Sequence, residues 1–238
     1  MASITDIAIH ADHKHLFKLE QYFAVYDKYF STYRDTNRNK PVRILEIGVF
    51  DGGSLDLWRM YFGEQAVIFG LDINPAVQQF ANENTHIVIC DQEDRAALEN
   101  KFKNEPPFDI ILDDGGHMPN QQIRSFEALF PLLHPNGVYI VEDVQTSYWK
   151  SFHGGLRQQN TFVEFSKLLL DYVNVDHFRT EDTYPLYPPL KESLCKQLTG
   201  VHFYDGMVAF VKGDKTRKNA IHYYGKSQIG IQCIKDWN

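Results

Sequence analysis

The segment RILEIGVFDGGSLDLWRMYF (residues 43–62) has the pattern of a β-strand, a glycine-rich loop and a helix in immediate succession. Its first part, RILEIG (43–48), is a short apolar strand, and SLDLWRMYF (54–62) has the apolar spacing of an amphipathic helix. Glycines near their junction allow the backbone to turn tightly. The segment therefore predicts the first unit of an α/β fold.

The same alternation continues toward the C-terminus. The segment HPNG (134–137) is expected to be the exit turn of a helix at 120–133, and Asp205–Gly206 joins two apolar runs within 201–213, a typical hairpin signal. Further strands are expected at 66–73, 86–91, 108–114 and 138–143, and further helices at 94–102 and 161–174. Strands separated by helices form a mainly parallel sheet. We therefore predict an α/β fold with a Rossmann-like, doubly wound, mainly parallel seven-stranded sheet and a C-terminal antiparallel hairpin.

The chain divides into three parts. Within residues 1–40, the apolar side chains between 14 and 33 have mostly helical spacing, which predicts a helical lid or extension. Residues 41–213 hold the alternating strands and helices, and residues 214–238 form a tail of mixed polarity. The segment YPLYPPL (184–190) is rich in proline and is expected to form a loop.

Composition excludes several classes of partner. The 24 basic and 31 acidic residues give a formal net charge of −7, which argues against general binding to nucleic acid or anionic membranes. The three cysteines are widely spaced without a CxxC pair, as is typical of a reducing compartment. The N-terminus lacks a signal-peptide pattern, and no apolar run is long enough to span a membrane. We therefore expect a cytoplasmic protein with no nucleic-acid or membrane partner.

Acidic residues lie at or near the end of each predicted parallel strand. They are Glu46, Asp72, Asp91, Asp114 and the pair Glu142–Asp143. A carboxylate in the apolar middle of a sheet is costly, whereas the carboxyl ends of parallel strands meet at one edge. Open α/β sheets bind ligands in the crevice at that edge, so the acids predict a functional site there.

The loop LEIGVFDGGSL (45–55) predicts a nucleotide-like ligand. Asp72 lies 20 residues after Gly52, where a carboxylate can accept hydrogen bonds from both ribose hydroxyls. Val49–Phe50 replaces the second glycine of the dinucleotide pattern, and Glu46 would repel a phosphate but favour an amino group or a sulfonium. S-adenosylmethionine carries both cations and no phosphate, so charge favours it over a dinucleotide. A tight turn without a ligand is the plain alternative.

Two positions beyond this loop have a double interpretation. Asp91–Gln92 can accept the exocyclic amine of adenine, or it can begin a helix as an N-cap. Asp113 can contact the cofactor, or it can have a structural role on the other face of its strand. The candidate cofactor contacts are Glu46, Gly48, Ser54, Asp72, Asp91, Gln92 and Asp113.

The stretch FDIILDDGGHMPN (108–120) ends an apolar strand on two carboxylates. The fourth and fifth strands of such a sheet are normally neighbours, so Asp114 should meet Glu142 and Asp143. Three carboxylates so close repel one another unless a cation lies among them. Oxygen ligands without a cluster of Cys or His favour magnesium over zinc, so we predict a magnesium site formed by these three acids.

Residues beside these acids predict a base and an acceptor site. Gly115–Gly116 allows a reversal that brings His117 over the same edge, and histidine is the usual general base near neutral pH. Gln145, Thr146, Tyr148 and Trp149 offer polar groups and aromatic faces that suit a sugar ring. The plain alternatives are exposed strand-end acids with a loop histidine, and packing of the two aromatic rings against the helix at 161–174.

Several of these runs together resemble one family. LEIGVFDGGSL, GLDI, CDQED, FDIILDDGGH and LFPLLHPNGVYIVEDVQTSYW are similar to the magnesium-dependent sugar O-methyltransferases of antibiotic biosynthesis, of the macrocin and mycinamicin types. The similarity covers roughly residues 41–150, and HFYDGMVAFVKG resembles the C-terminal hairpin of that family. The resemblance implies that residues 41–213 form a class I S-adenosylmethionine-dependent methyltransferase domain.

The resemblance also implies roles for individual residues. Asp114, Glu142 and Asp143 would hold magnesium, His117 would be the general base, and Glu46, Gly48, Asp72 and Asp91 would contact S-adenosylmethionine. The sequence departs from the family at Gly116, where serine is frequent, and its shorter length leads us to expect that an N-terminal domain of the macrolide enzymes is missing. We also expect a homo-oligomer.

The resulting hypothesis is a magnesium-assisted, S-adenosylmethionine-dependent O-methyltransferase acting on a hydroxyl of a sugar or glycosylated natural product. An NAD-dependent oxidoreductase and a non-catalytic sugar- or nucleotide-binding protein are the alternatives. His10, His13 and His15 lack a fourth ligand and are not expected to bind a metal. The basic run Lys212, Lys215, Arg217 and Lys218 is expected to be a solvated loop.

Overall fold

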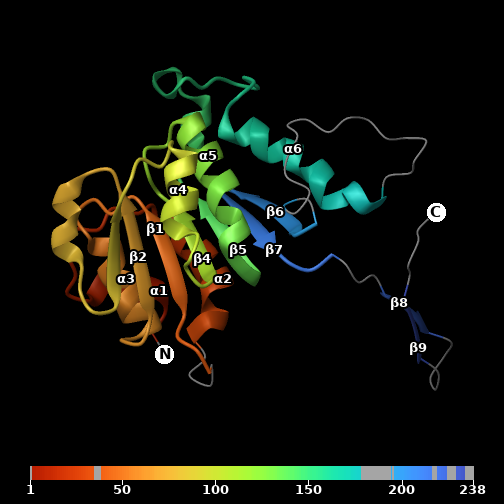
Figure 1. Cartoon of the computed structure of the whole chain (residues 1–238), viewed down its shortest axis with the longest axis horizontal. Coiled ribbons are helices and arrows are strands. Elements are labelled where there is room, and N and C mark those ends of the chain that lie inside the picture. The colour runs from red at the N-terminus through yellow and green to blue at the C-terminus, as the bar shows by residue number, and fades with distance from the viewer. Residues whose placement is uncertain are drawn as a thin grey trace.

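The computed structural model describes residues 2–34, 39–177, 194, 196–215, 219–223 and 229–233. Its main feature is a seven-stranded sheet with the strand order β3-β2-β1-β4-β5-β7-β6 (Figure 1). The strands are β1 (Arg43–Ile47), β2 (Val67–Asp72), β3 (Thr85–Ile89), β4 (Phe108–Asp113), β5 (Leu133–Val141), β6 (Leu198–Tyr204) and β7 (Met207–Lys212). The first five are parallel, and β7 runs antiparallel to both β5 and β6. The predicted fold class, including the C-terminal hairpin, is confirmed.

Helices cover both faces of the sheet, because alternate strand residues point to opposite sides. Ile44 and Ile110 belong to the core shared with α2 and α3, whereas Leu45 and Ile111 belong to the core shared with α4, α5 and α6. The helices are α1 (Ile4–His10), α2 (Glu20–Phe30), α3 (Gly53–Phe62), α4 (Arg95–Phe102), α5 (Pro119–Leu129) and α6 (Phe162–Asn174). Figure 1 shows α4 and α5 in front of the sheet and α3 behind it. This two-sided core fixes the edge at which the parallel strands end.

The N-terminal helix is shorter than the sequence predicts. The expected helix spans 14–33, but α2 begins only at Glu20. Its N-cap residue is Leu19, whose side chain makes no capping hydrogen bond. Residues 11–19 instead run without regular structure past the carboxyl ends of the strands. Side-chain contacts to the carboxyl ends of the strands override the helical spacing of the apolar residues there. The most buried of these contacts is the ion pair of Lys18 with Asp114.

Two further predictions need correction. The segment HPNG lies within β5, which begins at Leu133, and is not a free exit turn. The register between β4 and β5 shifts between Phe108 and Ile110, opposite this segment. Lys212 is buried in β7 and is not in a solvated loop, since its Nζ donates to the carbonyl oxygens of Pro131 and Leu133 at 2.7 Å each.

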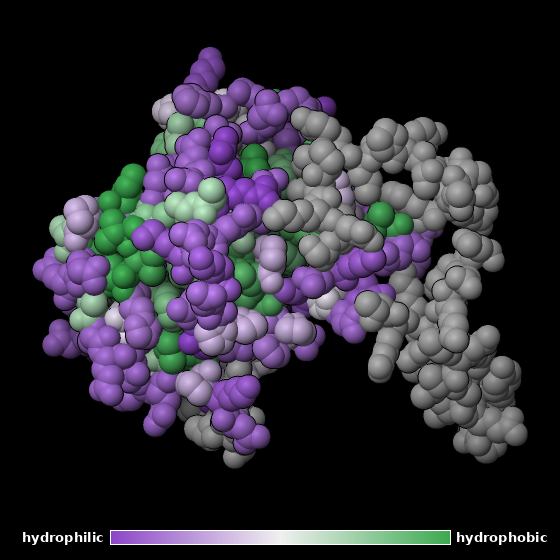
Figure 2. Space-filling model, in the orientation of Figure 1, coloured by the Kyte–Doolittle hydropathy of each residue, from purple (hydrophilic) through white to green (hydrophobic). Residues whose placement is uncertain are grey.

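Outside the main sheet, the tail contains a two-stranded antiparallel pair that the sequence did not predict, β8 (Asn219–Tyr223) and β9 (Ile229–Cys233). The proline-rich segment 184–190 lies outside the described residues. In the described part of the chain, no helix combines the length and apolar character needed to cross a bilayer. The face in Figure 2 is mostly hydrophilic with smaller hydrophobic areas, in keeping with the two internal cores.

Candidate active site

A cavity of about 820 Å³ lies at the carboxyl ends of the parallel strands. Its volume falls in the range of about 300–1,000 Å³ that is usual for small-molecule sites. It is lined by the N-terminal segment (His15 to Leu19), the glycine loop (Gly48 to Asp51), the ends of β2 and β3 (Asp72 to Asn74 and Cys90 to Gln92), and the ends of β4 and β5 (Asp114 to His117 and Glu142–Asp143). Five strand-end or loop segments predicted from sequence therefore meet in one cavity.

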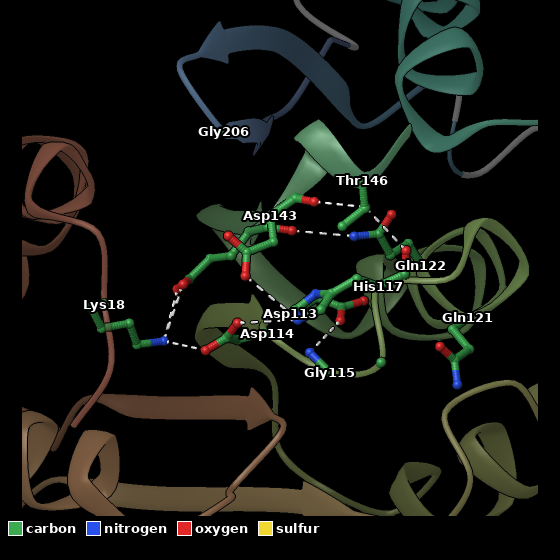
Figure 3. Close-up of polar contacts among 12 residues, drawn as sticks. Lys18, Asp113, Asp114, Gly115, His117, Gln121, Gln122, Asp143, Thr146 and Gly206 are labelled. Atoms are coloured by element: carbon green, nitrogen blue, oxygen red, sulfur yellow. Dashed lines mark hydrogen bonds and ion pairs between the residues drawn. The ribbon is translucent and has the colours of Figure 1, made fainter. Parts of the chain in front are cut away.

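Carboxylates from β4 and β5 converge on one wall of this cavity. These strands are neighbours, with Asp113 opposite Val141, so the residues that follow them emerge side by side. Ligand atoms of Asp114, His117 and Asp143 all lie within 4.8 Å of one another. His117 Nε2 is 3.5 Å from Asp143 Oδ2 and 4.0 Å from Asp114 Oδ1 (Figure 3). The predicted convergence of the two strand ends is thus present in the fold.

The turn that carries His117 achieves its reversal differently from the predicted glycine joint. His117 itself has a left-handed φ of 60°, and Asp143 has a φ of 53°. Non-glycine residues in this region carry strain that the surrounding structure must overcome, and such strain clusters at functional sites. The glycines serve packing instead, because a Cβ on Gly115 would lie 2.0 Å from Gln92 Oε1 and a Cβ on Gly116 2.2 Å from Gln121 Oε1.

Glu142 points away from His117, toward the N-terminal segment. Its carboxylate accepts hydrogen bonds from Tyr26 Oη at 2.5 Å and from Lys18 Nζ at 3.1 Å. Burial, reinforced by the charge of Asp114, raises the pKa of Glu142 well above its ordinary value. The Lys18 ammonium and the Tyr26 hydroxyl oppose this rise without cancelling it.

The residues present fit a divalent metal ion. Asp114 and Asp143 supply carboxylate oxygens within 4.8 Å of each other, and magnesium commonly uses only one or two protein carboxylates. His117 Nδ1 is buried without a hydrogen-bond partner among the described residues. The structure therefore brings Asp114 and Asp143 of the predicted metal set together with His117. The third member of the set, Glu142, shares the Lys18 ammonium with Asp114.

The cofactor candidates divide into two groups. Asp72, Asp91, Gln92, Gly48 and Ser54 line the cavity. The Asp72 carboxylate also shapes the glycine loop, because Oδ2 accepts from Val49 N at 2.9 Å and Oδ1 from Asn74 N at 2.8 Å. Asp91 Oδ1 accepts from Glu93 N at 2.8 Å, as a turn-initiating carboxylate does. These residues can contact a nucleoside while they hold their own loops.

Glu46 is fully buried and does not line the cavity. Its Oε2 accepts from Ser54 Oγ at 2.7 Å and from Trp58 Nε1 at 3.0 Å. Burial raises the pKa of its carboxyl group, although the Lys18 ammonium opposes this. Glu46 therefore reaches the cavity only through its neighbours Ser54 and Lys18.

Asp113 is also fully buried and does not line the cavity. Its Oδ2 accepts from Ser125 Oγ at 2.5 Å, and its Oδ1 accepts from Gln92 Nε2 at 3.1 Å. Burial raises the pKa of Asp113 to about 6. Gln92 Oε1 in turn accepts from Gly116 N at 2.8 Å. Of the two interpretations of Asp113, this geometry favours the structural one, in which it supports the turn before His117 through Gln92.

The acceptor candidates follow β5 in a 3₁₀ turn, Val144–Tyr148. Gln145 Nε2 donates to Asp143 Oδ1 at 2.8 Å, and Thr146 Oγ1 donates to the carbonyl oxygens of Asp143 and His117 at 2.7 and 3.2 Å. These two side chains thus hold the turns of the metal-binding edge. Tyr148 and Trp149 are 46% and 49% exposed and do not line the cavity, which leaves their rings available at the surface beside it.

Sequence reasoning missed three contributors to the site. They are Lys18 of the N-terminal segment and Tyr22 and Tyr26 of α2. Tyr22 Oη donates to Asp143 Oδ1 at 2.6 Å, as Tyr26 does to Glu142. The spacing of aromatic residues in 14–33 marks a packing helix and carries no sign of these hydroxyl contacts. Their detection needed the fold, because the contacts join residues 96 to 121 positions apart.

Comparison with known proteins agrees with this architecture. A family model described as a methyltransferase domain matches residues 45–144. An 8-demethyl-8-alpha-L-rhamnosyl tetracenomycin-C 2'-O-methyltransferase of Streptomyces olivaceus is 35% identical over 71% of this chain and 46% of its own. The mycinamicin VI 2''-O-methyltransferase of Micromonospora griseorubida is 33% identical over 82% of this chain and 49% of its own. The chain belongs to the methyltransferase family.

A solved structure supports the same assignment for this methyltransferase. MycE methyltransferase from the mycinamycin biosynthetic pathway, in complex with Mg and SAH, superposes with a TM-score of 0.72 at 30% identity, over 84% of this chain and 50% of that one. The sequence resemblance to sugar O-methyltransferases is thereby confirmed, and the sheet is the Rossmann-like sheet of that fold. This methyltransferase spans about half the length of the relatives it matches.

Proposed function

We propose that this methyltransferase transfers the methyl group of S-adenosylmethionine to a hydroxyl of a sugar or glycosylated small molecule, with the help of magnesium. The observation that carries the proposal is a single cavity that joins the nucleoside-binding candidates Asp72 and Asp91 to the cluster of Asp114, His117 and Asp143. Relatives named for sugar O-methylation, and MycE in complex with Mg, SAH and mycinamycin VI, support the same reaction class.

Asp114 and Asp143 are the residues that would hold magnesium, with Glu142 next to them. When bound, magnesium supplies a positive charge that orients a sugar hydroxyl and lowers its pKa. Tyr22 fixes Asp143 Oδ1 and leaves Asp143 Oδ2 directed at His117. The chain thus holds its carboxylates in place before a ligand arrives, which reduces the ordering required on binding.

His117 is assigned the role of general base. Its Nε2 faces the cavity edge within 4.0 Å of both Asp114 and Asp143, so the imidazolium formed on proton uptake is stabilised by two carboxylates. The Gln92 and Thr146 contacts keep its turn in position. Removal of the hydroxyl proton leaves an oxygen that attacks the sulfonium methyl carbon, and S-adenosylhomocysteine leaves.

The N-terminal part belongs to the same functional unit in this proposal. Residues 15–19 line the cavity and α2 contributes hydroxyls to the metal-binding edge, so the predicted boundary near residue 40 does not separate the active site from its lid. A homo-oligomer and a cytoplasmic location stay as predictions from sequence.

Methyl transfer from S-adenosylmethionine to a panel of glycosides, followed by mass spectrometry, tests the proposal. We expect a mass gain of one methyl group on a sugar hydroxyl, loss of the gain with EDTA, and recovery with magnesium. Undiminished transfer in EDTA would refute the metal role. Thermal stabilisation by NAD without stabilisation by S-adenosylhomocysteine would favour the oxidoreductase alternative.

A further inference from the structure

Lys18 makes the most buried ion-pair cluster of the active site. Its side chain is 2% exposed, and Nζ lies 2.6 Å from Asp114 Oδ2 and 3.1 Å from both oxygens of Glu142 (Figure 3). A third carboxylate, Glu46, lies at 3.5 Å. Lys18 belongs to the N-terminal segment, outside the residues 45–144 that match the family domain.

Burial of an ammonium group is costly, so its presence here needs a counterpart. Carboxylate oxygens of Asp114, Glu142 and Glu46 all lie within 3.5 Å of its Nζ and are the charged partners that a buried ammonium requires. Lys18 therefore places a positive charge among the acids. Tyr22 and Tyr26 donate neutral hydroxyl groups to Asp143 and Glu142. Hydrogen bonding to these acids can therefore be met without a cation, and Lys18 adds a charge.

The charges at this edge are unequal. Three acids, Glu46, Asp114 and Glu142, contact Lys18, and Asp143 lies beside His117, so the carboxylates outnumber the one lysine. Lys18 and a metal ion would share Asp114, since Nζ contacts Oδ2 while Oδ1 belongs to the group formed with His117 and Asp143.

We propose that Lys18 is a positioning residue whose charge sets the affinity of the carboxylate edge for a divalent metal ion. The inference rests on the metal role in the proposed function. A fixed cation on Asp114 and Glu142 weakens the pull of both carboxylates on a second cation, because like charges at short range repel strongly when solvent is excluded. It also offsets the mutual repulsion of the acids, so that they stay together when metal is scarce.

Magnesium binding by the whole protein, measured without cofactor or acceptor, tests this inference. Isothermal titration calorimetry and thermal shift against magnesium concentration give readouts independent of turnover. We expect Lys18→Met to bind magnesium about tenfold more tightly than the wild type and to gain more thermal stability from it. Lys18→Arg, which keeps the charge, should bind magnesium within about threefold of the wild type.

Each outcome separates the inference from the function it rests on. Unchanged or weaker magnesium binding by Lys18→Met would overturn the inference, as would equal tightening in Lys18→Arg. Absence of magnesium binding by the wild type itself would instead overturn the metal role. Should Lys18→Met fail to fold, Lys18→Gln decides, because it removes the charge but keeps a hydrogen-bond donor: it should also bind magnesium more tightly than the wild type, and unchanged or weaker binding overturns the inference.

Discussion

At the scale of the residue, His117 is the group on which proton removal depends in this mechanism. Its Nε2 lies 3.5 Å from Asp143 Oδ2, and its Nδ1 makes no described hydrogen bond. We expect His117→Ala to lower kcat by about 100- to 10,000-fold, the usual contribution of a general base. Calorimetry with S-adenosylhomocysteine should show nearly unchanged binding, and full turnover by the variant would remove His117 from the mechanism.

Gly48 provides a second prediction at this scale. Its φ is +90°, and a Cβ would lie 2.0 Å from the carbonyl oxygen of Asp114, so the glycine loop depends on close approach to the end of β4. We expect Gly48→Ala to lower the free energy of unfolding by more than 2 kcal/mol, about 1–3 from the backbone alone plus the displaced loop. Urea unfolding and S-adenosylhomocysteine affinity measure both effects.

Gly63→Ala is the matched control for this substitution. Gly63 has the same φ of +90°, but nothing lies within 4 Å of the Cβ position. It should therefore report the backbone strain alone and leave cofactor affinity unchanged. Equal losses of stability in both variants would show that the approach to Asp114 is not what requires Gly48.

At the scale of the element, the strands were predictable and the N-terminal segment was not. The positions of β1 to β5 followed from apolar runs that end on acidic residues. Because β4 and β5 are neighbours, Asp114 lies near Asp143, as expected. The helical spacing of 14–33 overestimated α2, because contacts of Lys18 with the distant Asp114 and Glu142 decide the path of 14–19. Local periodicity contains no information on such long-range ion pairs.

The same limit applies to the buried acids of β1 and β4. Glu46 was predicted to contact the cofactor, and Asp113 either to contact it or to have a structural role. In the structure Glu46 turns to Ser54 and Trp58, and Asp113 turns to Ser125. The two faces of a strand end differ by one residue in sequence. Which face looks into the cavity is set by how α3 and α5 pack, which the pattern alone does not contain.

Lys212 allows a prediction on the junction between β7 and β5. Burial lowers its pKa from 10.5 to about 8. A lysine whose folded pKa is depressed favours the neutral amine in the folded state, so the free energy of unfolding should rise between about pH 8 and 10.5. Hydrogen bonds to the Pro131 and Leu133 carbonyls favour the charged form and reduce this rise, which we place at about 1–3 kcal/mol.

Urea unfolding at pH 7.5 and pH 10, compared between the wild type and Lys212→Met, isolates this contribution. The variant lacks the titrating group, so its stability should fall relative to the wild type as the pH rises. A difference between the two proteins that does not change with pH would contradict the buried environment of Lys212.

At the scale of the whole molecule, the doubly wound sheet explains why one edge collects all the chemistry. Parallel strands β1 to β5 end on the same side, and the cavity there draws on segments from His15 to Asp143. The N-terminal segment, although outside the matched family domain, contributes Lys18, Tyr22 and Tyr26 to the acids. In the proposed reaction, the residues that contact the cofactor, the acids that hold the metal and the N-terminal residues therefore act as one unit.

Anomalous diffraction from crystals of the protein with manganese and S-adenosylhomocysteine would show whether the metal and the cofactor occupy this one cavity. Manganese replaces magnesium at oxygen-rich sites and scatters anomalously. We predict one strong peak within coordination distance of the carboxylates of both Asp114 and Asp143, with the nucleoside beside Asp72 in the same cavity. A peak elsewhere, or a nucleoside outside this cavity, would contradict the proposed chemistry.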